Sequence, residues 1–444
     1  WLRGVECQEP SAMLESTLPL TRCPWQLVCF LLGVCRSPCS AQFLCGRAWT
    51  DDSCSPLGTN VSGCTPQGYS LLPTSPDWIG IRQRLVREMF GQDKLPTRSR
   101  PDSIRNLTVK HFFPDCLYAA WGKGRRSDCE KDVNVTEIQW TILARLRANY
   151  SMTLTSKVFL TRNTSGIAPN YDIWGAGQPA DPELPRPGKT LVIFHNGHGL
   201  SKGCPTYGDT DGTADWLNQM GYDVATIMMP FKDCNSDPAD PPSLHAWFEA
   251  FEDSHVPWVR YFLEPVINTI NFAESALSYD QIVMMGLSGG GWTTTLAAAL
   301  DTRIVLSVPI AGSIPCDFRH TSWDFEQFCS DRWAQIGNYT ALYVLAALEK
   351  HRTSVQMLHE ADPCCFHACG RHARIEEYNS FVRSQTGGLF RTVVTEGNQH
   401  QFNPREKIIA GYLIEKIVRK QEIGQFDLGT PFNLLHESEH ALIV

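Results

Sequence analysis

The chain has 444 residues, 43% of them hydrophobic and 19% charged, which is the composition of a globular protein with a large core and excludes a disordered chain. Its formal net charge is −8, and basic residues are not clustered beyond Arg125 and Arg126, so the sequence argues against a nucleic-acid or anionic-membrane partner. A small or polymeric neutral substrate remains compatible with this charge. The sequence does not indicate an oligomeric state.

Residues 1–41 are predicted to be an upstream segment followed by a signal peptide. Arg22 precedes an apolar stretch over 25–34, and the small residues Ser40 and Ala41 follow it. We expect cleavage after Ala41. The alternatives are an N-terminal anchor or a buried hydrophobic segment; a ten-residue apolar core is too short to span a bilayer, so we expect no integral membrane span.

Cysteines and glycosylation motifs also indicate export. Five of the 17 cysteines precede the predicted cleavage site, which leaves an even number for disulfides in an oxidising compartment. Neighbours along the sequence suggest the pairs Cys116 with Cys129, Cys204 with Cys234, and Cys316 with Cys329. The Asn-x-Ser/Thr motifs are at Asn60, Asn106, Asn134, Asn149, Asn163 and Asn338. We therefore expect a secreted glycoprotein.

The rest of the chain divides into three predicted parts. Residues 42–150 are expected to form a disulfide-containing, Cys/Pro/Gly-rich extension with amphipathic segments at 78–90 and 135–146, and residues 425–444 a C-terminal tail. The main domain is predicted over 151–424 and begins with an antiparallel strand at 153–161. Further strands are predicted near 190–195, 222–228, 281–286, 303–309, 354–359 and 390–395. Because helix-like segments separate them, we expect an α/β fold with a mostly parallel sheet and helices on both faces.

The strand predicted at 281–286 ends in Gly286-Leu287-Ser288-Gly289-Gly290 and leads into a helix-forming segment. This pattern is typical of a nucleophile elbow, where a strained serine raises its hydroxyl above the sheet and glycines avoid collisions. We therefore predict Ser288 as a nucleophile. The alternative is a glycine-rich turn that packs helix against strand and has no chemical role.

A serine that attacks an acyl group needs two backbone N–H donors for the oxyanion, one directly after the nucleophile and one after an earlier strand. Gly289 is the first predicted donor. The strand at 190–194 runs into a loop from His195 to Gly199, where we predict the His198 N–H as the second donor and the Gly199 N–H as its competitor. The alternative is that the histidines only cap the strand.

The other members of a catalytic triad are expected in the chain order Ser, Asp or Glu, His, each on a loop after a later strand. The strand at 355–359 stops before Pro363, which makes Asp362 the predicted acid. Glu360 is the alternative acid, and an Asp-Pro turn is the alternative without chemistry. The strand at 390–395 precedes a loop that contains His400, the predicted base.

We predict no metal and no cofactor at this site. No carboxylate or cysteine stands at ligand spacing beside His195 and His198. The cluster over 364–369, together with His372, offers zinc-type donors as an alternative. An oxidising compartment favours a disulfide in this loop instead.

From about Met152 to Leu413 these segments resemble the α/β-hydrolase superfamily. The motifs that carry the resemblance are Gly286 to Trp292, Ala361 to Phe366, His195 to Gly199, and Arg260 to Pro265. Within the superfamily the chain looks most similar to serine hydrolases loosely allied to acetyl xylan esterases and polyhydroxyalkanoate depolymerases. The resemblance implies a carboxylic ester hydrolase with catalytic roles at Ser288, Asp362 and His400, and it implies no particular substrate.

The sequence thus predicts a secreted serine hydrolase that cleaves an acylated carbohydrate, a polyester or a small acyl ester. Peptidases and thioesterases use the same triad. A non-catalytic binding or adhesion protein on a hydrolase scaffold is the alternative from another class, but such a protein has no chemical need for all three triad residues. A metal-dependent deacetylase is a third alternative, which chelators would inhibit.

Overall fold

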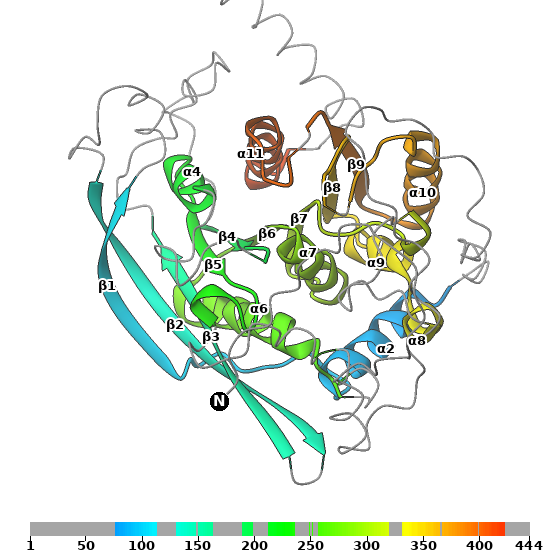
Figure 1. The fold of residues 1–444 in the computed structure, drawn as a ribbon. Helices are drawn as coiled ribbons and strands as arrows, with labels where there is room; N and C mark the ends of the chain where they lie inside the picture. Colours follow the sequence, from blue (N-terminus) through cyan, green and yellow to red (C-terminus); the bar gives the residue numbers. More distant parts are fainter. Residues whose placement is uncertain are drawn as a thin grey trace, which may run out of the picture. The chain divides into compact units, whose positions relative to one another are not determined.

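The computed structural model describes residues 76–112, 130–147, 150–162, 189–198, 212–235, 248, 251, 256–318, 331–364, 366–397 and 399–421 (Figure 1). The predicted signal peptide, the start of the predicted extension with its first cysteines, and the predicted C-terminal tail lie outside these ranges. Within them, no helix is long and apolar enough to cross a membrane.

Nine strands of the described chain form one sheet in the order β1-β2-β3-β5-β4-β6-β7-β8-β9 (Figure 1). Its parallel part consists of β5 (Asp223–Ile227), β4 (Thr190–His195), β6 (Gln281–Leu287), β7 (Ile304–Ile310), β8 (Thr353–His359) and β9 (Leu389–Thr395). Apart from the edge strand β9, these strands are buried along almost their whole length, which is why most of them read as largely apolar runs in the sequence. The predicted mostly parallel sheet is confirmed, with every one of these strands within one residue of its expected ends.

The antiparallel part of the sheet consists of β1 (Ser103–Phe112), β2 (Glu130–Arg147) and β3 (Tyr150–Thr161). β3 is the early strand predicted at 153–161, and it pairs with β5 in antiparallel fashion, so it joins the two parts. β1 and β2 come from the segment that the sequence analysis assigned to the extension. They continue the sheet of the main domain, so the sheet begins at Ser103, upstream of the predicted domain start.

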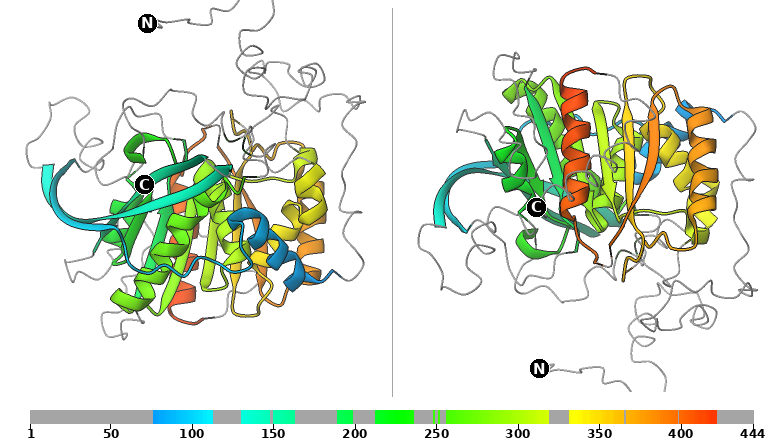
Figure 2. Two further views of the ribbon diagram at one scale, coloured as in Figure 1. Left: turned by 90° about the horizontal axis from the view of Figure 1, so that it is seen from below. Right: turned by 90° about the horizontal axis from the view of Figure 1, so that it is seen from above.

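Helices cover both faces of the sheet, as predicted (Figures 1 and 2). α4 (Thr213–Gln219) and α11 (Pro404–Val418) lie side by side on one face, where Trp216 meets Phe402 edge-to-face. The other face carries α2 (Trp78–Phe90), α6 (Arg260–Phe272), α7 (Gly289–Leu300), α9 (Tyr339–Ala346) and α10 (His372–Gln385). The shorter helices are η5 (Asp233–Asn235), η7 (Ala273–Leu277), η8 (Cys316–Phe318) and α8 (Asp331–Ile336). The order of strands and helices agrees with the alternation that the sequence predicted.

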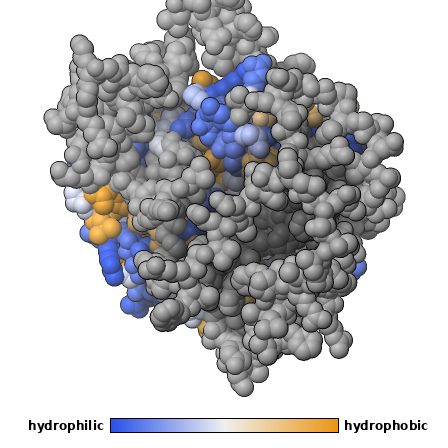
Figure 3. Space-filling model, viewed as in Figure 1, coloured by the Kyte–Doolittle hydropathy of each residue, from blue (hydrophilic) through white to orange (hydrophobic). Residues whose placement is uncertain are grey.

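The edge strand β1 presents a mixed surface. Figure 3 shows apolar and hydrophilic residues side by side on this part of the molecule. Ile104 is 51% exposed, whereas its exposed neighbours Arg105, Asn106 and Thr108 are polar. Polar and charged side chains on an edge strand discourage pairing with another chain.

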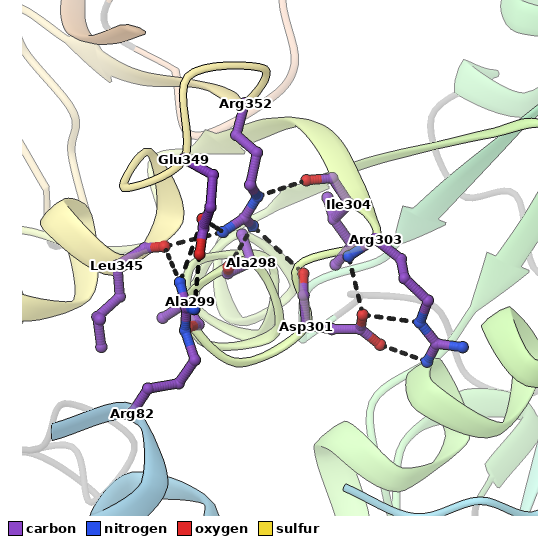
Figure 4. Close-up of polar contacts among 9 residues, drawn as sticks. All are labelled: Arg82, Ala298, Ala299, Asp301, Arg303, Ile304, Leu345, Glu349 and Arg352. Atoms are coloured by element: carbon purple, nitrogen blue, oxygen red, sulfur yellow. Dashed lines mark hydrogen bonds and ion pairs between the residues drawn. The ribbon is translucent and has the colours of Figure 1, made fainter. Parts of the chain in front are cut away.

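A buried arginine ties α7, α9 and the sheet together (Figure 4). Arg352 is fully buried, and its guanidinium donates to the carbonyls of Ile304 at 3.0 Å and Leu345 at 2.8 Å, and to that of Ala298. Its charge is balanced by Glu349 at 3.1 Å, which also accepts from Arg82 of α2 at 2.7 Å. α2 is thereby fastened to the main domain.

Replacement of Arg352 by methionine is expected to lower the free energy of unfolding by about 4 kcal/mol, because several buried carbonyls lose their donor at once. Urea denaturation of purified protein measures this change. The matched control is Arg87→Met, which breaks the exposed ion pair between Arg87 and Asp93 and should have little effect. Equal stability of Arg352→Met and wild type would show that the network does not hold these elements together.

Candidate active site

Ser288 lies between the end of β6 and the start of α7 in a conformation with φ 57° and ψ −126°. Positive φ is uncommon for a residue with a side chain. It costs free energy and persists only where the surroundings impose it. Here both sides of the residue are held: its N–H donates to the Ile310 carbonyl at 2.9 Å, and its carbonyl accepts from the Trp292 N–H at 2.9 Å. This is the geometry of a nucleophile elbow.

The glycines around Ser288 are required by close backbone approaches. A Cβ on Gly290 would lie 1.9 Å from the carbonyl oxygen of His195, and a Cβ on Gly286 would lie 2.4 Å from that of Gly290. The start of α7 therefore packs directly against the end of β4, which brings the loop after β4 to the nucleophile.

Replacement of Gly290 by alanine is expected to lower the free energy of unfolding by about 3 kcal/mol, because backbone must move to admit the methyl group. Chemical denaturation measures the loss, and activity should fall with it as the elbow shifts. Gly397→Ala is the matched control, since a Cβ there would meet only the Asn403 Nδ2 atom, at 3.7 Å. A Gly290→Ala protein as stable as the control would contradict the packing described here.

The loop after β4 packs against Ser288. A Cβ on Gly197 would be 2.8 Å from the Cβ of Ser288 and 2.7 Å from the Leu287 carbonyl oxygen. His195, the last residue of β4, is fully buried with its Nδ1 atom 2.8 Å from the Asn196 carbonyl oxygen. Of the predicted oxyanion donors, Gly289 directly follows Ser288 and His198 directly follows Gly197, whereas Gly199 lies outside the described residues. Gly289 thus borders Ser288 along the chain, whereas His198 borders Gly197, the loop residue that lies against Ser288.

Asp362 and His400 are brought together by the ends of β8 and β9. His400 Nδ1 lies 2.8 Å from Asp362 Oδ2 in a hydrogen bond, and the Cys364 N–H donates to the other carboxylate oxygen at 2.7 Å. The ring of Phe366 stacks on the imidazole of His400 with centroids 6.4 Å apart. His400 therefore has a fixed ring orientation and a carboxylate on its Nδ1 atom, as a catalytic base would need.

Asp362 is buried yet ionised. Burial raises the pKa of its carboxyl group, but the contacts with His359 and His400 and the Cys364 N–H outweigh that effect and hold the pKa well below its usual range. The carboxylate is therefore charged at any pH at which the enzyme would work.

Glu360, the alternative acid, points elsewhere. Its carboxylate forms an ion pair with His372 at 2.9 Å, and the His372 side chain is 59% exposed. In the described structure the partner of His400 is Asp362, so the geometry favours Asp362 over Glu360 as the acid.

No hydrogen bond joins His400 to Ser288 in the described part of the chain, where His400 Nε2 is buried without a hydrogen-bond partner. The two residues follow β6 and β9, whose carboxyl ends point to the same edge of the sheet. Hydrogen bonds between base and nucleophile are often long without substrate and tighten in the complex. The structure thus brings together Asp362 with His400 and the Gly197 loop with Ser288.

Two residues with no predicted role belong to this site. His359, the last residue of β8, and Glu406, in the first turn of α11, are both fully buried beside Asp362. The signal in the sequence was a histidine at the end of an apolar strand, three residues before the predicted acid. The contribution of Glu406 could not be read from the sequence because it comes from a distant helix.

A disulfide occupies one of the possible metal ligands in this region. Among the described residues, Asp362, Cys364 and His400 each place one ligand atom within 4.8 Å of the others, but Cys364 is in a disulfide and offers no thiolate. Cys369, Cys234 and Cys316 are also disulfide-bonded. The partners predicted for the last two, Cys204 and Cys329, lie outside the described residues, so these pairings stay predictions.

A second metal-type pattern is present in the C-terminal tail. The sequence over 436–440 is His-Glu-Ser-Glu-His, which has the spacing of a zinc-binding helix. It lies outside the described residues. A chelator control in any activity assay addresses it directly.

The decisive observations for the fold are the strand order, the antiparallel entry through β3, and a strained serine directly after β6. The chain has the α/β-hydrolase fold. No protein-family model matches the sequence, and no curated protein matches it. The assignment therefore rests on the chain's own topology and elbow.

The fold aligns with solved structures of low sequence identity. An acetyl xylan esterase from Paenibacillus sp. R4 is 12% identical over 78% of this chain and 95% of that chain, with a TM-score of 0.43. Acetyl xylan esterase 1 from Thermoanaerobacterium sp. JW/SL YS485 is 12% identical over 78% and 94%, with a TM-score of 0.42. The Pyrococcus furiosus esterase Pf2001 is 10% identical over 63% and 93%, with a TM-score of 0.38.

Proposed function

We propose that this α/β-hydrolase is a serine hydrolase that cleaves carboxylic esters through an acyl-enzyme intermediate. The observation that carries the proposal is the strained elbow at Ser288, which lies on the sheet edge where Asp362 is hydrogen-bonded to His400. Holding a serine at positive φ costs free energy. A nucleophile elbow explains why this cost is accepted, because the conformation exposes the hydroxyl.

In the proposed mechanism His400 removes the proton from the Ser288 hydroxyl as its oxygen attacks the acyl carbon. Asp362 accepts the Nδ1 hydrogen bond of His400 and stabilises the imidazolium that forms. The N–H groups of Gly289 and His198 hold the oxyanion, each worth about 3 kcal/mol of transition-state stabilisation. His400 then protonates the leaving alcohol, and water activated by His400 releases the acid.

The substrate is proposed to be a neutral acyl ester, on a small molecule, a carbohydrate or a polyester. The net charge of −8 disfavours polyanionic substrates such as nucleic acids. Peptide or thioester cleavage would use the same residues in the same roles. The acyl and alcohol groups have to be found by assay.

Secretion is part of the proposal. The disulfide-bonded cysteines Cys234, Cys316, Cys364 and Cys369 suit an oxidising compartment. Two predicted glycosylation sites, Asn106 and Asn134, are exposed on β1 and β2, where a glycan would meet solvent. Asn338 caps α9 by accepting from the Ala341 N–H at 3.0 Å, so that side chain also has a structural role.

The proposal is tested by hydrolysis of p-nitrophenyl esters from acetate to decanoate by the purified full-length protein. We expect turnover that depends on acyl length and persists in excess chelator. Loss of all activity with chelator would indicate a metal-dependent deacetylase instead. A folded protein without turnover of any ester would leave a binding protein on a hydrolase scaffold.

A further inference from the structure

A second histidine contacts the carboxylate of the acid. The Asp362 Oδ2 atom that accepts from His400 also lies 3.6 Å from the Nδ1 atom of His359. The Nε2 atom of His359 lies 2.8 Å from Glu406 Oε1. His359 therefore lies between two carboxylates as an ion-pair partner of both, although neither contact has hydrogen-bond geometry, and all three side chains are fully buried.

Glu406 is a fixed anchor for this bridge. It is part of the capping box of α11, in which its Oε2 atom accepts from the Asn403 N–H at 3.0 Å and its own N–H donates to Asn403 Oδ1 at 2.9 Å. Its Oε1 atom also accepts from the Thr395 hydroxyl at 2.8 Å. Because both of its carboxylate oxygens accept hydrogen bonds, the side chain of Glu406 is held in place by α11 and β9. His359 is therefore aligned with these two elements.

Two carboxylates in one buried site need a cation between them. Burial alone lowers the pKa of His359, but the contacts with Asp362 and Glu406 and their charges raise it to about 9. Besides His359, the ionisable side chain of His400 contacts Asp362. The neighbouring carboxylate of Glu360 is paired with His372 at the surface. His359 thus carries the charge that balances the pair.

We propose that His359 is a positioning residue: doubly protonated, it links Asp362 to Glu406 and holds the Asp362 carboxylate against His400. This inference rests on the proposed function.

The test compares kcat and KM of His359→Gln with those of wild type for hydrolysis of p-nitrophenyl acetate at neutral pH. We expect kcat to fall by about tenfold, because an Asp362 carboxylate that is held less firmly aligns His400 less well. KM should hardly change, since His359 is fully buried and does not touch the substrate.

His372→Gln is the matched control, because it makes the same change in an exposed histidine paired with a carboxylate two positions before Asp362. Its kcat should equal that of wild type. A purely structural role for His359 would reduce the amount of folded protein but would leave kcat per folded molecule unchanged. A His359→Gln protein with the kcat of wild type would overturn the proposal.

Imidazole nitrogen–proton NMR spectra of the wild type test the bridge independently of hydrolysis. We expect both ring nitrogens of His359 to carry protons at pH 7.5, and one proton to leave only as the pH rises through about 9. In Glu406→Gln this loss should occur at lower pH, which provides a test even where His359→Gln does not fold. A neutral His359 at pH 7.5, or an unchanged titration in Glu406→Gln, would overturn the bridge. A doubly protonated His359 in a protein that hydrolyses no ester would contradict the proposed function and leave the bridge in place.

The same charge makes stability depend on pH. The pKa of His359 is higher in the folded chain, about 9, than the value of about 6.5 for an unfolded histidine, so its contribution is complete below pH 6.5 and is lost as the pH rises through 9. The unfolding free energy of wild type should therefore fall between pH 6.5 and 9 more steeply than that of His359→Gln. Parallel curves would contradict the protonated bridge.

Discussion

Ser288→Ala is expected to lower kcat by about a million-fold, because removal of a triad nucleophile leaves only the binding and oxyanion contributions to the rate. The backbone at Ser288 is held by the Ile310 carbonyl and the Trp292 N–H, and alanine has the same backbone requirements as serine. Thermal unfolding of the variant should therefore match that of wild type. Steady-state hydrolysis of the best p-nitrophenyl ester measures the loss.

The matched control for Ser288→Ala is Ser380→Ala, which removes a hydroxyl from the exposed face of α10. We expect full activity in that variant. A folded Ser288→Ala protein with the rate of wild type would exclude Ser288 as the nucleophile, and the elbow would then be a packing turn.

Asp362→Asn is expected to lower kcat by about ten-thousand-fold with little change in KM, because an amide favours the wrong tautomer of His400 and does not stabilise its imidazolium. Asp362 also faces His359, so the variant leaves that buried cation with Glu406 as its remaining carboxylate partner among the described residues. We therefore expect a lower free energy of unfolding as well, which urea denaturation would show.

Glu360→Gln distinguishes the two acids that the sequence left open. The carboxylate of Glu360 pairs with His372 at the surface, so this change should leave kcat nearly unaltered. The opposite result, with activity lost in Glu360→Gln and retained in Asp362→Asn, would make Glu360 the acid and require a different arrangement of the loop after β8.

Most of the parallel strands could be predicted from the sequence because they are buried along almost their whole length. β4, for example, is buried at every position, so its limits follow an apolar run. The elbow was visible for a different reason: Gly286 and Gly290 are imposed by backbone contacts too close for a Cβ, and their spacing around Ser288 records that constraint.

The antiparallel edge could not be predicted in the same way. β1 exposes several polar residues and shows no regular alternation of buried and exposed positions. Its pairing with β2 depends on contacts between two segments that are separated in the sequence. The bridge from His359 to Glu406 was also hidden, because it joins residues on different elements and depends on where α11 packs. Local patterns report burial and turns, whereas such contacts depend on the assembled fold.

The most direct measurement for the central claim is to react the purified protein with a labelled fluorophosphonate and to locate the adduct by peptide mass spectrometry. Serine hydrolases react at the nucleophile, whose hydroxyl the neighbouring histidine activates. We predict one adduct, on Ser288, that is absent in Ser288→Ala and strongly slowed in Asp362→Asn. An adduct at another residue, equal labelling of Ser288→Ala, or no labelling of a folded wild-type protein would contradict the catalytic account.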